Sequence, residues 1–217
     1  MLPVKNARPG SGAGGYTLIE ALVTLAIFST LLALGIPSMN SWMMSNKAAS
    51  ASEFYMEGFR TARQQAIAHN TASRIVLTAN QTTGQMDWQV DLCFPTQAAP
   101  CTGVSANWST TTAAAANDPD SLNANATAYK SLKRSADALP SITVIGPTLY
   151  PANASAVYYT ALGWVDTSYT NNLVRLQLDP LPAYVSQLPT AAISITLAGM
   201  PIRCNIAAAS GDSRVCP

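Results

Sequence analysis

An apolar run of 21 residues, from Tyr16 to Ile36, constrains this chain more than any other feature of its sequence. Its only charged side chain is Glu20. As an α-helix rising about 1.5 Å per residue, the run matches the roughly 30 Å hydrocarbon core of a bilayer. Lys5 and Arg8 precede the run and little positive charge follows it. This asymmetry predicts a membrane helix with a cytoplasmic N-terminus and an exported C-terminal part.

The run differs from an ordinary secretory signal, in which a shorter apolar stretch is followed by a small-residue cleavage site. Here Gly14 and Gly15 precede the apolar residues, so a cut at that point leaves the helix attached. A carboxylate within a membrane span costs about 2.5–3.5 kcal/mol near the helix centre. Glu20 therefore needs a partner, and an amino group freed by cleavage before Tyr16 is suitable, from the same chain or a neighbour. A plain signal anchor is the alternative.

The residues Gly15-Tyr16-Thr17-Leu18-Ile19-Glu20 resemble the processing motif of type IV pilins and type II secretion pseudopilins. The resemblance implies that a prepilin peptidase cuts after Gly15 and methylates the new N-terminus at Tyr16. It also implies that Glu20, the fifth residue after the cut, guides subunits into a filament. Pro37, the twenty-second, matches a proline that is frequent in the family. Tyr16 departs from the usual Phe but remains aromatic.

A second, amphipathic helix is predicted over residues 37–70. Pro37 lacks a backbone N–H and crowds the preceding turn, so we expect a kink or break there. Beyond it, apolar residues recur at helical spacing while polar residues occupy the other side. We expect the apolar side to pack on a sheet. The apolar positions are Ala51, Tyr55, Phe59, Ala62 and Ala66, and the polar positions are Glu53, Glu57, Arg60 and Gln64.

The end of this helix resembles the segment before the first strand in the GspH/FimT family of minor pilins and pseudopilins. The matching features are Ala62-Arg63, Ala66-Ile67, Asn70 and the strand that follows. We interpret Arg63 as a solvated charge on the flank of the helix.

After residue 70 the hydrophobic period changes to two, which indicates β-strands. Strands with one apolar face predict an antiparallel sheet packed on the helix. The expected fold is α+β and pilin-like: a long N-terminal helix, with a transmembrane half and an amphipathic half, on a β-sheet head. The expected parts are a cleaved leader 1–15, helices 16–36 and 37–70, and a head 71–217 with an irregular surface excursion over 98–128. The strand candidates are 73–78, 86–92, 142–145, 156–160, 174–178 and 193–197.

Four cysteines, Cys93, Cys101, Cys204 and Cys216, allow three disulfide connectivities. An exported domain meets an oxidising compartment, so disulfides are favoured over thiols. Proximity in the sequence favours Cys93–Cys101 and Cys204–Cys216, each stabilising the fold by about 2–3 kcal/mol. The 204–216 loop resembles the C-terminal disulfide-bounded region of many type IV pilins. The sequence lacks the C-x₂-C unit that is usual in structural zinc sites, which disfavours zinc binding by these cysteines.

No catalytic constellation is evident, so we expect a protein that is not an enzyme and needs no cofactor or metal. The only histidine, His69, lies at the predicted helix end, where a polar ring complements exposed carbonyl groups. Asp118 and Asp120 lie in the polar excursion and are interpreted as solvated acids, with ion binding as the alternative.

DNA binding is the main rival function, because FimT-type relatives resemble DNA receptors for natural transformation. Those proteins tend to carry Gly-Arg-x-Arg, whereas this chain has Met200 after Gly199 and one arginine in that stretch. The chain has 12 Lys and Arg against 11 Asp and Glu, so no general positive field attracts DNA. The candidate local contacts are Lys130, Lys133, Arg134, Arg203 and Arg214.

The sequence is best interpreted as a minor pilin of a type IV pilus that joins the filament near its tip. Its implied partners are prepilin peptidase and other minor and major pilins. Its implied location is the bacterial inner membrane before assembly, with the head outside the cytoplasm, and afterwards the pilus at the cell surface. The alternatives are a GspH-like pseudopilin of a type II secretion system and a DNA-binding, FimT-like minor pilin.

Overall fold

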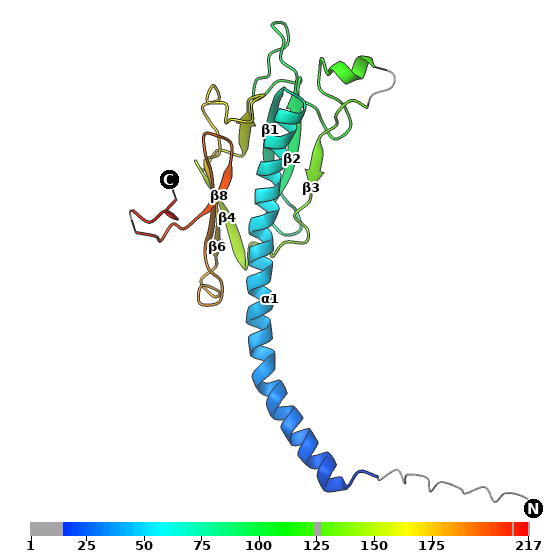
Figure 1. Ribbon diagram of the computed structural model, residues 1–217, viewed down its shortest axis with the longest axis vertical. Helices are drawn as coiled ribbons and strands as arrows, with labels where there is room; N and C mark the ends of the chain where they lie inside the picture. The colour runs from blue at the N-terminus through cyan, green and yellow to red at the C-terminus, as the bar shows by residue number, and fades with distance from the viewer. Residues whose placement is uncertain (1–14, 124–126, 210, 217) are drawn as a thin grey trace, which may run out of the picture. The chain divides into compact units, whose positions relative to one another are not determined.

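The computed structural model describes residues 15–123, 127–209 and 211–216 (Figure 1). Most of the predicted leader, residues 1–14, lies outside this description, as do the side chains of residues 34–38, 40, 41 and 122. The chain divides into an N-terminal unit, residues 1–42, and a second unit, residues 43–217. We call the second unit the head.

One helix, α1 (Leu18–Ala68), includes both of the helical segments expected from the sequence. It continues through Pro37, so the break predicted at that residue is not seen. Loss of the one hydrogen bond that Pro37 cannot donate is not enough to end the helix. Within the described residues, no helix combines the length and mean hydropathy that a membrane span requires. The span predicted over residues 16–36 is therefore not shown.

The described residues of the head form two antiparallel sheets of four strands each, which gives the α+β arrangement expected from the sequence. The strand order is β3-β2-β1-β5 in the first sheet and β4-β6-β7-β8 in the second. A short 3₁₀ helix, η1 (Pro119–Leu122), lies between β2 and β3 in the chain. The strands are β1 (Ala72–Ala79), β2 (Met86–Cys93), β3 (Leu132–Arg134), β4 (Ile145–Tyr150), β5 (Ala156–Tyr159), β6 (Arg175–Pro180), β7 (Ala191–Ile195) and β8 (Pro201–Cys204).

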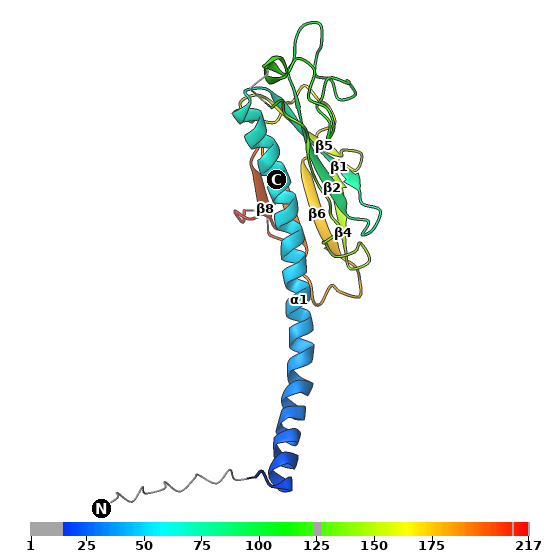
Figure 2. The same cartoon turned by 90° about the vertical axis from the view of Figure 1, so that its right-hand side faces the viewer.

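The part of α1 in the head lies beside the strands of both sheets and forms one core with them (Figures 1 and 2). Gly58 brings the helix close to the first sheet, because a Cβ there would meet Ile75 and Trp88 at 2.8 to 3.0 Å. The indole of Trp88 also donates a hydrogen bond to the Phe54 carbonyl. The five apolar helix positions predicted to face a sheet are all fully buried: Ala51, Tyr55, Phe59, Ala62 and Ala66.

The helix ends in a left-handed residue, Asn70, whose φ is 47°. Its N–H bonds to the Ile67 carbonyl and the Thr71 N–H bonds to the Ala66 carbonyl, at 3.2 and 3.1 Å. This double closure satisfies carbonyl groups that the helix leaves unpaired, and Asn tolerates the left-handed conformation. The ring of His69 lies edge-on to Tyr129, with centroids 5.3 Å apart.

The segment 98–128, expected to be a surface excursion, is partly buried against the first sheet. Trp108 and Asp118 are 4% and 1% exposed. Ser109 Oγ accepts a hydrogen bond from the Leu92 N–H of β2 at 2.9 Å. Most of the segment's other described residues are exposed or half-buried, and apart from η1 the segment is irregular. It covers the face of the sheet that carries Arg74 and Asp91, opposite to the face of Ile75 and Val90.

Candidate assembly site and head surface

The N-terminus of α1 has the geometry of a capped helix. Thr17 precedes the first helical residue, and its side-chain oxygen accepts a hydrogen bond from the Glu20 N–H at 3.3 Å. The Ala21 N–H bonds to the Thr17 carbonyl at 3.1 Å. Thr followed three residues later by Glu is the spacing of a capping box, which fixes where a helix begins. The helix therefore starts two residues after the predicted cleavage position, and Glu20 lies in its first turn.

Glu20 is exposed and lies among exposed apolar side chains. It is the only charged residue in the described part of the N-terminal unit. The ion pairs of the described chain all lie in the head. A contiguous apolar surface of this kind marks a contact with a membrane or with other protein. The exposed apolar residues include Leu18, Ile19, Leu22, Val23, Leu25, Ile27, Phe28, Leu31 and Leu32.

Residues 11–36 match the family model of the prokaryotic N-terminal methylation motif. This motif indicates a type IV pilin-type or pseudopilin precursor. For such a precursor, the motif implies a membrane anchor, processing by prepilin peptidase and assembly with other pilins. The motif suggests that the protein is a structural subunit and not an enzyme. Comparison of the chain with curated proteins and with solved structures gives no match.

Four of the five basic residues considered for DNA contact are paired with carboxylates in the head. Glu53 and Glu57 lie one turn apart on α1. Each forms an ion pair with an arginine on an edge strand: Glu57 with Arg134 of β3 in the first sheet, and Glu53 with Arg203 of β8 in the second. The fifth residue, Lys130, is exposed. Because the paired charges are balanced locally, they offer phosphate groups little net attraction. The pairs are Lys133–Asp87 at 3.3 Å, Arg134–Glu57 at 3.2 Å, Arg203–Glu53 at 2.6 Å and Arg214–Asp212 at 2.9 Å.

Other charged residues singled out in the sequence have structural contacts. Arg63 Nε donates to the Ala198 carbonyl at 3.3 Å. Asp118 caps η1, since its carboxylate accepts from the Asp120 N–H and the Tyr129 N–H, both at 3.0 Å. In the described part of the chain, no cluster of three or more His, Cys, Asp or Glu side chains is arranged for a metal ion.

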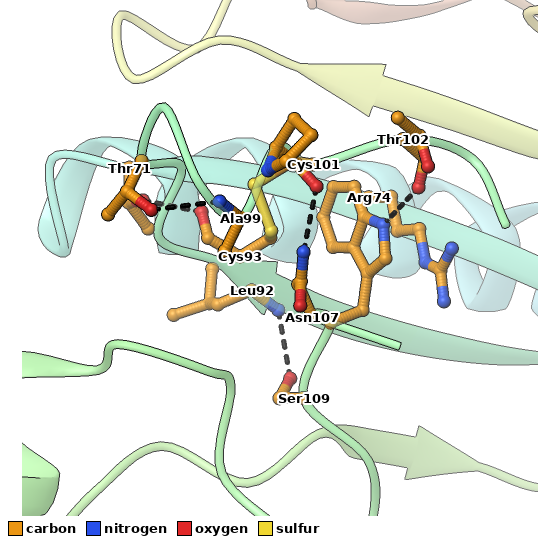
Figure 3. The surroundings of a disulfide bond; sticks show 12 residues. Thr71, Arg74, Leu92, Cys93, Ala99, Cys101, Thr102, Asn107 and Ser109 are labelled. Atoms are coloured by element: carbon orange, nitrogen blue, oxygen red, sulfur yellow. Dashed lines mark hydrogen bonds between the residues drawn. A yellow bond between two sulfur atoms is a disulfide. The ribbon is translucent and has the colours of Figure 1, made fainter. Parts of the chain in front are cut away.

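The structure has disulfides at the two pairs that proximity in the sequence favoured, Cys93–Cys101 and Cys204–Cys216. The first ties the end of β2 to the following loop (Figure 3). Thr71 Oγ1 donates to the Cys93 carbonyl at 2.6 Å, and the Trp108 indole donates to the Thr102 carbonyl at 2.7 Å. This disulfide therefore anchors the loop that covers the first sheet.

Two structural features were missed in the sequence. One is the buried ion pair between Arg74 and Asp91. The sequence indicated it only through opposite charges in two segments that were predicted to be neighbouring strands. The other is a pair of turns with the sequence Thr-x-x-Gly, at 160–163 and 196–199. In each turn the Gly N–H bonds to the Thr carbonyl at 2.8 Å, and the glycine has a φ of +75°.

The surroundings of Asp87 predict a stability of the head that depends on pH. Burial raises the pKa of Asp87, but hydrogen bonds from the Ala136 N–H and Asn80, together with Lys133, outweigh burial and lower the pKa below its ordinary value. When the pKa of a carboxyl is lower in the folded state than in the unfolded state, the charged carboxyl stabilises the fold at a pH above its unfolded-state pKa, which is near 3.9 for Asp. This stabilisation is lost as the pH falls through the folded-state pKa.

We therefore expect the free energy of unfolding to fall as the pH is lowered from about 5 to about 3, and to fall less steeply in Asp87→Asn. Urea unfolding followed by tryptophan fluorescence measures both slopes. Equal slopes for the two proteins would contradict a native-state pKa lowered at Asp87.

Proposed function

We propose that this chain is a minor pilin of a type IV pilus, a structural subunit that enters the filament near its tip. The observation that carries the proposal is the exposed apolar face at the start of α1, with Glu20 as its single charge. Such a surface needs lipid before assembly and neighbouring helices afterwards.

In this proposal, peptidase cleaves between Gly15 and Tyr16 and methylates Tyr16. Residues 16–36 hold the precursor in the inner membrane with the head on the outer side. During assembly, helices of other pilins replace lipid around the segment that ends near Pro37. The Glu20 carboxylate pairs with the N-terminal amine of Tyr16, in the same chain or a neighbour. The head, closed by its two disulfides, reaches the pilus surface and selects neighbouring subunits.

Replacing the carboxylate tests this role. We expect Glu20→Ala to leave membrane insertion and cleavage unchanged and to lower incorporation into filaments at least about tenfold, which corresponds to about 1.4 kcal/mol. The physical reason is the loss of an ion pair in surroundings of low dielectric constant. Immunoblots of sheared filaments and of membranes measure the distribution. Intact mass shows whether the chain starts at methylated Tyr16 and lacks four hydrogens for two disulfides.

Thr24→Ala is the matched control, because Thr24 is an exposed polar residue one turn further along α1. Among the described residues, its hydroxyl bonds only to the Ala21 carbonyl of its own helix, at 2.9 Å. We expect this variant to be incorporated normally. Normal incorporation of Glu20→Ala, or retention of residues 1–15 in filaments, would refute the proposal.

A pseudopilin of a type II secretion system shares the processing motif. The four cysteines and the long head favour the pilus. Deletion of the gene separates the two functions: loss of surface pili supports the minor pilin, whereas loss of protein secretion with intact pili supports the pseudopilin.

A further inference from the structure

The head has a cleft of about 480 Å³ that the proposed assembly function does not use. Three separate segments form it: the loop at 101–103, the start of β5, and residues 168–171. The Cys93–Cys101 disulfide fixes the first segment (Figure 3). Arg74 Nη1 also donates to the Gly103 carbonyl at 2.9 Å. The loop is therefore held from two sides.

Two stacked tyrosines belong to the lining of the cleft. The rings of Tyr158 and Tyr169 are parallel, with centroids 3.8 Å apart and 1° between their planes. Trp108 lies 5.9 Å from Tyr158, and the Tyr169 hydroxyl donates to the Cys101 carbonyl. These contacts hold the rings in place before a ligand arrives, which reduces the entropy lost on binding. Tyr169 also borders an adjacent groove of about 820 Å³, so it is shared by two hollows of the surface.

The other cleft walls offer uncharged hydrogen-bonding groups. The hydroxyls of Thr102, Ser155 and Thr170 line the cleft, and none of them makes a hydrogen bond to another described residue. The Asn171 amide nitrogen donates to the Asn153 carbonyl at 2.8 Å, which leaves its side-chain oxygen as an acceptor. The cleft thus combines an apolar face with several neutral donors and acceptors, as specific small-molecule sites do.

None of the residues that line the cleft carries a charge. The nearby Arg74 is paired with Asp91 at 2.8 Å, and its guanidinium lies 4.5 Å from the centre of the Trp108 ring. Asp166, also nearby, accepts from the Ser168 hydroxyl at 2.6 Å. A phosphate, a carboxylate or an ammonium group would find no opposite charge among these walls, which disfavours ionic ligands.

We propose that this cleft binds a neutral saccharide. An apolar face of a sugar ring packs on an outer face of the stacked tyrosine pair, and its hydroxyl groups bond to Thr102, Ser155, Thr170 and Asn171. Aromatic rings with a polar edge are suited to ligands that carry both apolar and hydrogen-bonding surfaces. The proposal concerns the head alone and does not depend on how the subunit assembles.

The test uses the full-length protein in a detergent that contains no sugar, with cellotetraose, chitotetraose and a sulfated tetrasaccharide as probes. Calorimetry measures the dissociation constants at low and high salt. We expect one or both neutral probes to bind with an affinity that salt leaves unchanged, because no ion pair is involved. The preferred probe distinguishes a plain hexose from an N-acetylated one.

Tyr169→Ala should weaken the binding of the neutral probe at least about tenfold, the equivalent of about 1.4 kcal/mol. Trp164→Ala is the matched control, since Trp164 is an exposed aromatic residue that lines neither hollow. Thr170→Val keeps the side-chain shape and should weaken binding several-fold with unchanged unfolding. Absence of binding to both neutral probes, equal affinity in all variants, or binding to the sulfated probe alone would overturn the proposal.

Discussion

Replacing Asp91 with Ala is expected to lower the free energy of unfolding of the head by about 3–5 kcal/mol, the cost of leaving one member of a buried ion pair alone. The side chains of Asp91 and Arg74 are 2% and 17% exposed, and they approach to 2.8 Å. Without the carboxylate, the guanidinium keeps its contact with Trp108 and its bond to Gly103. Neither contact supplies the missing negative charge. Urea unfolding of the disulfide-intact protein measures the loss.

Glu57→Ala provides the matched control. Its pair with Arg134 has a similar distance, 3.2 Å, but the two side chains are 51% and 55% exposed. Water and salt screen such a pair, so its removal should cost less than about 1 kcal/mol. The double variant Arg74→Met, Asp91→Leu removes both charges together and should regain most of the stability lost in Asp91→Ala. If Asp91→Ala costs no more than Glu57→Ala, the buried pair does not have the proposed importance.

The helix and most of the strands were predictable because their hydrophobic periods are local. A four- or three-residue repeat defines the buried face of α1, and alternation defines β2 at residues 86–92. The strand candidate at 142–145 was misplaced, because it shares only Ile145 with β4. Two strands were not predicted at all, β3 and β8, which have three and four residues. So few residues do not establish a period, and each strand depends on pairing with a neighbour, β2 or β7.

Composition alone does not reveal which residues of the segment 98–128 are buried. A segment rich in Ala, Thr, Asn and Ser suggested an exposed loop, yet Trp108 and Asp118 within it are almost completely buried. Trp108 packs over the guanidinium of Arg74 on β1, which is paired with Asp91 on β2. Sequence patterns describe the face of a strand that meets the core, and they do not reveal what covers the opposite face.

The candidate sites differ in the same way. The processing motif is a continuous segment around Gly15 and Glu20, so it could be recognised without a fold. The cleft brings Thr102 together with Tyr158 and Tyr169, which lie far from Thr102 in the chain. Only tertiary contacts bring them together, and no spacing in the sequence indicates them.

Gly199→Ala is expected to destabilise the head by about 3 kcal/mol or more, from left-handed strain of about 1–2 kcal/mol and from overpacking. Gly199 has a φ of +75°, a conformation that Ala adopts at a cost. A Cβ at this position would overlap the carbonyl oxygen of Gly163 and lie 3.2 Å from the ring of Tyr159. The Gly163 oxygen belongs to the backbone of the other Thr-x-x-Gly turn. It cannot move unless that turn also moves, together with the Val165 N–H bond to the Leu197 carbonyl.

Two other glycines separate conformational strain from overlap. Gly163 has the same φ, but a Cβ there would meet side-chain atoms of Ile67 and Arg63 and no backbone atom among its nearest neighbours. Gly211 has a φ of +103° and open space around it. Stability measured by urea unfolding should therefore fall most in Gly199→Ala, less in Gly163→Ala, and by about 1 kcal/mol in Gly211→Ala. Equal losses in all three variants would mean that backbone strain alone matters and that the contact between the two turns does not hold the head together.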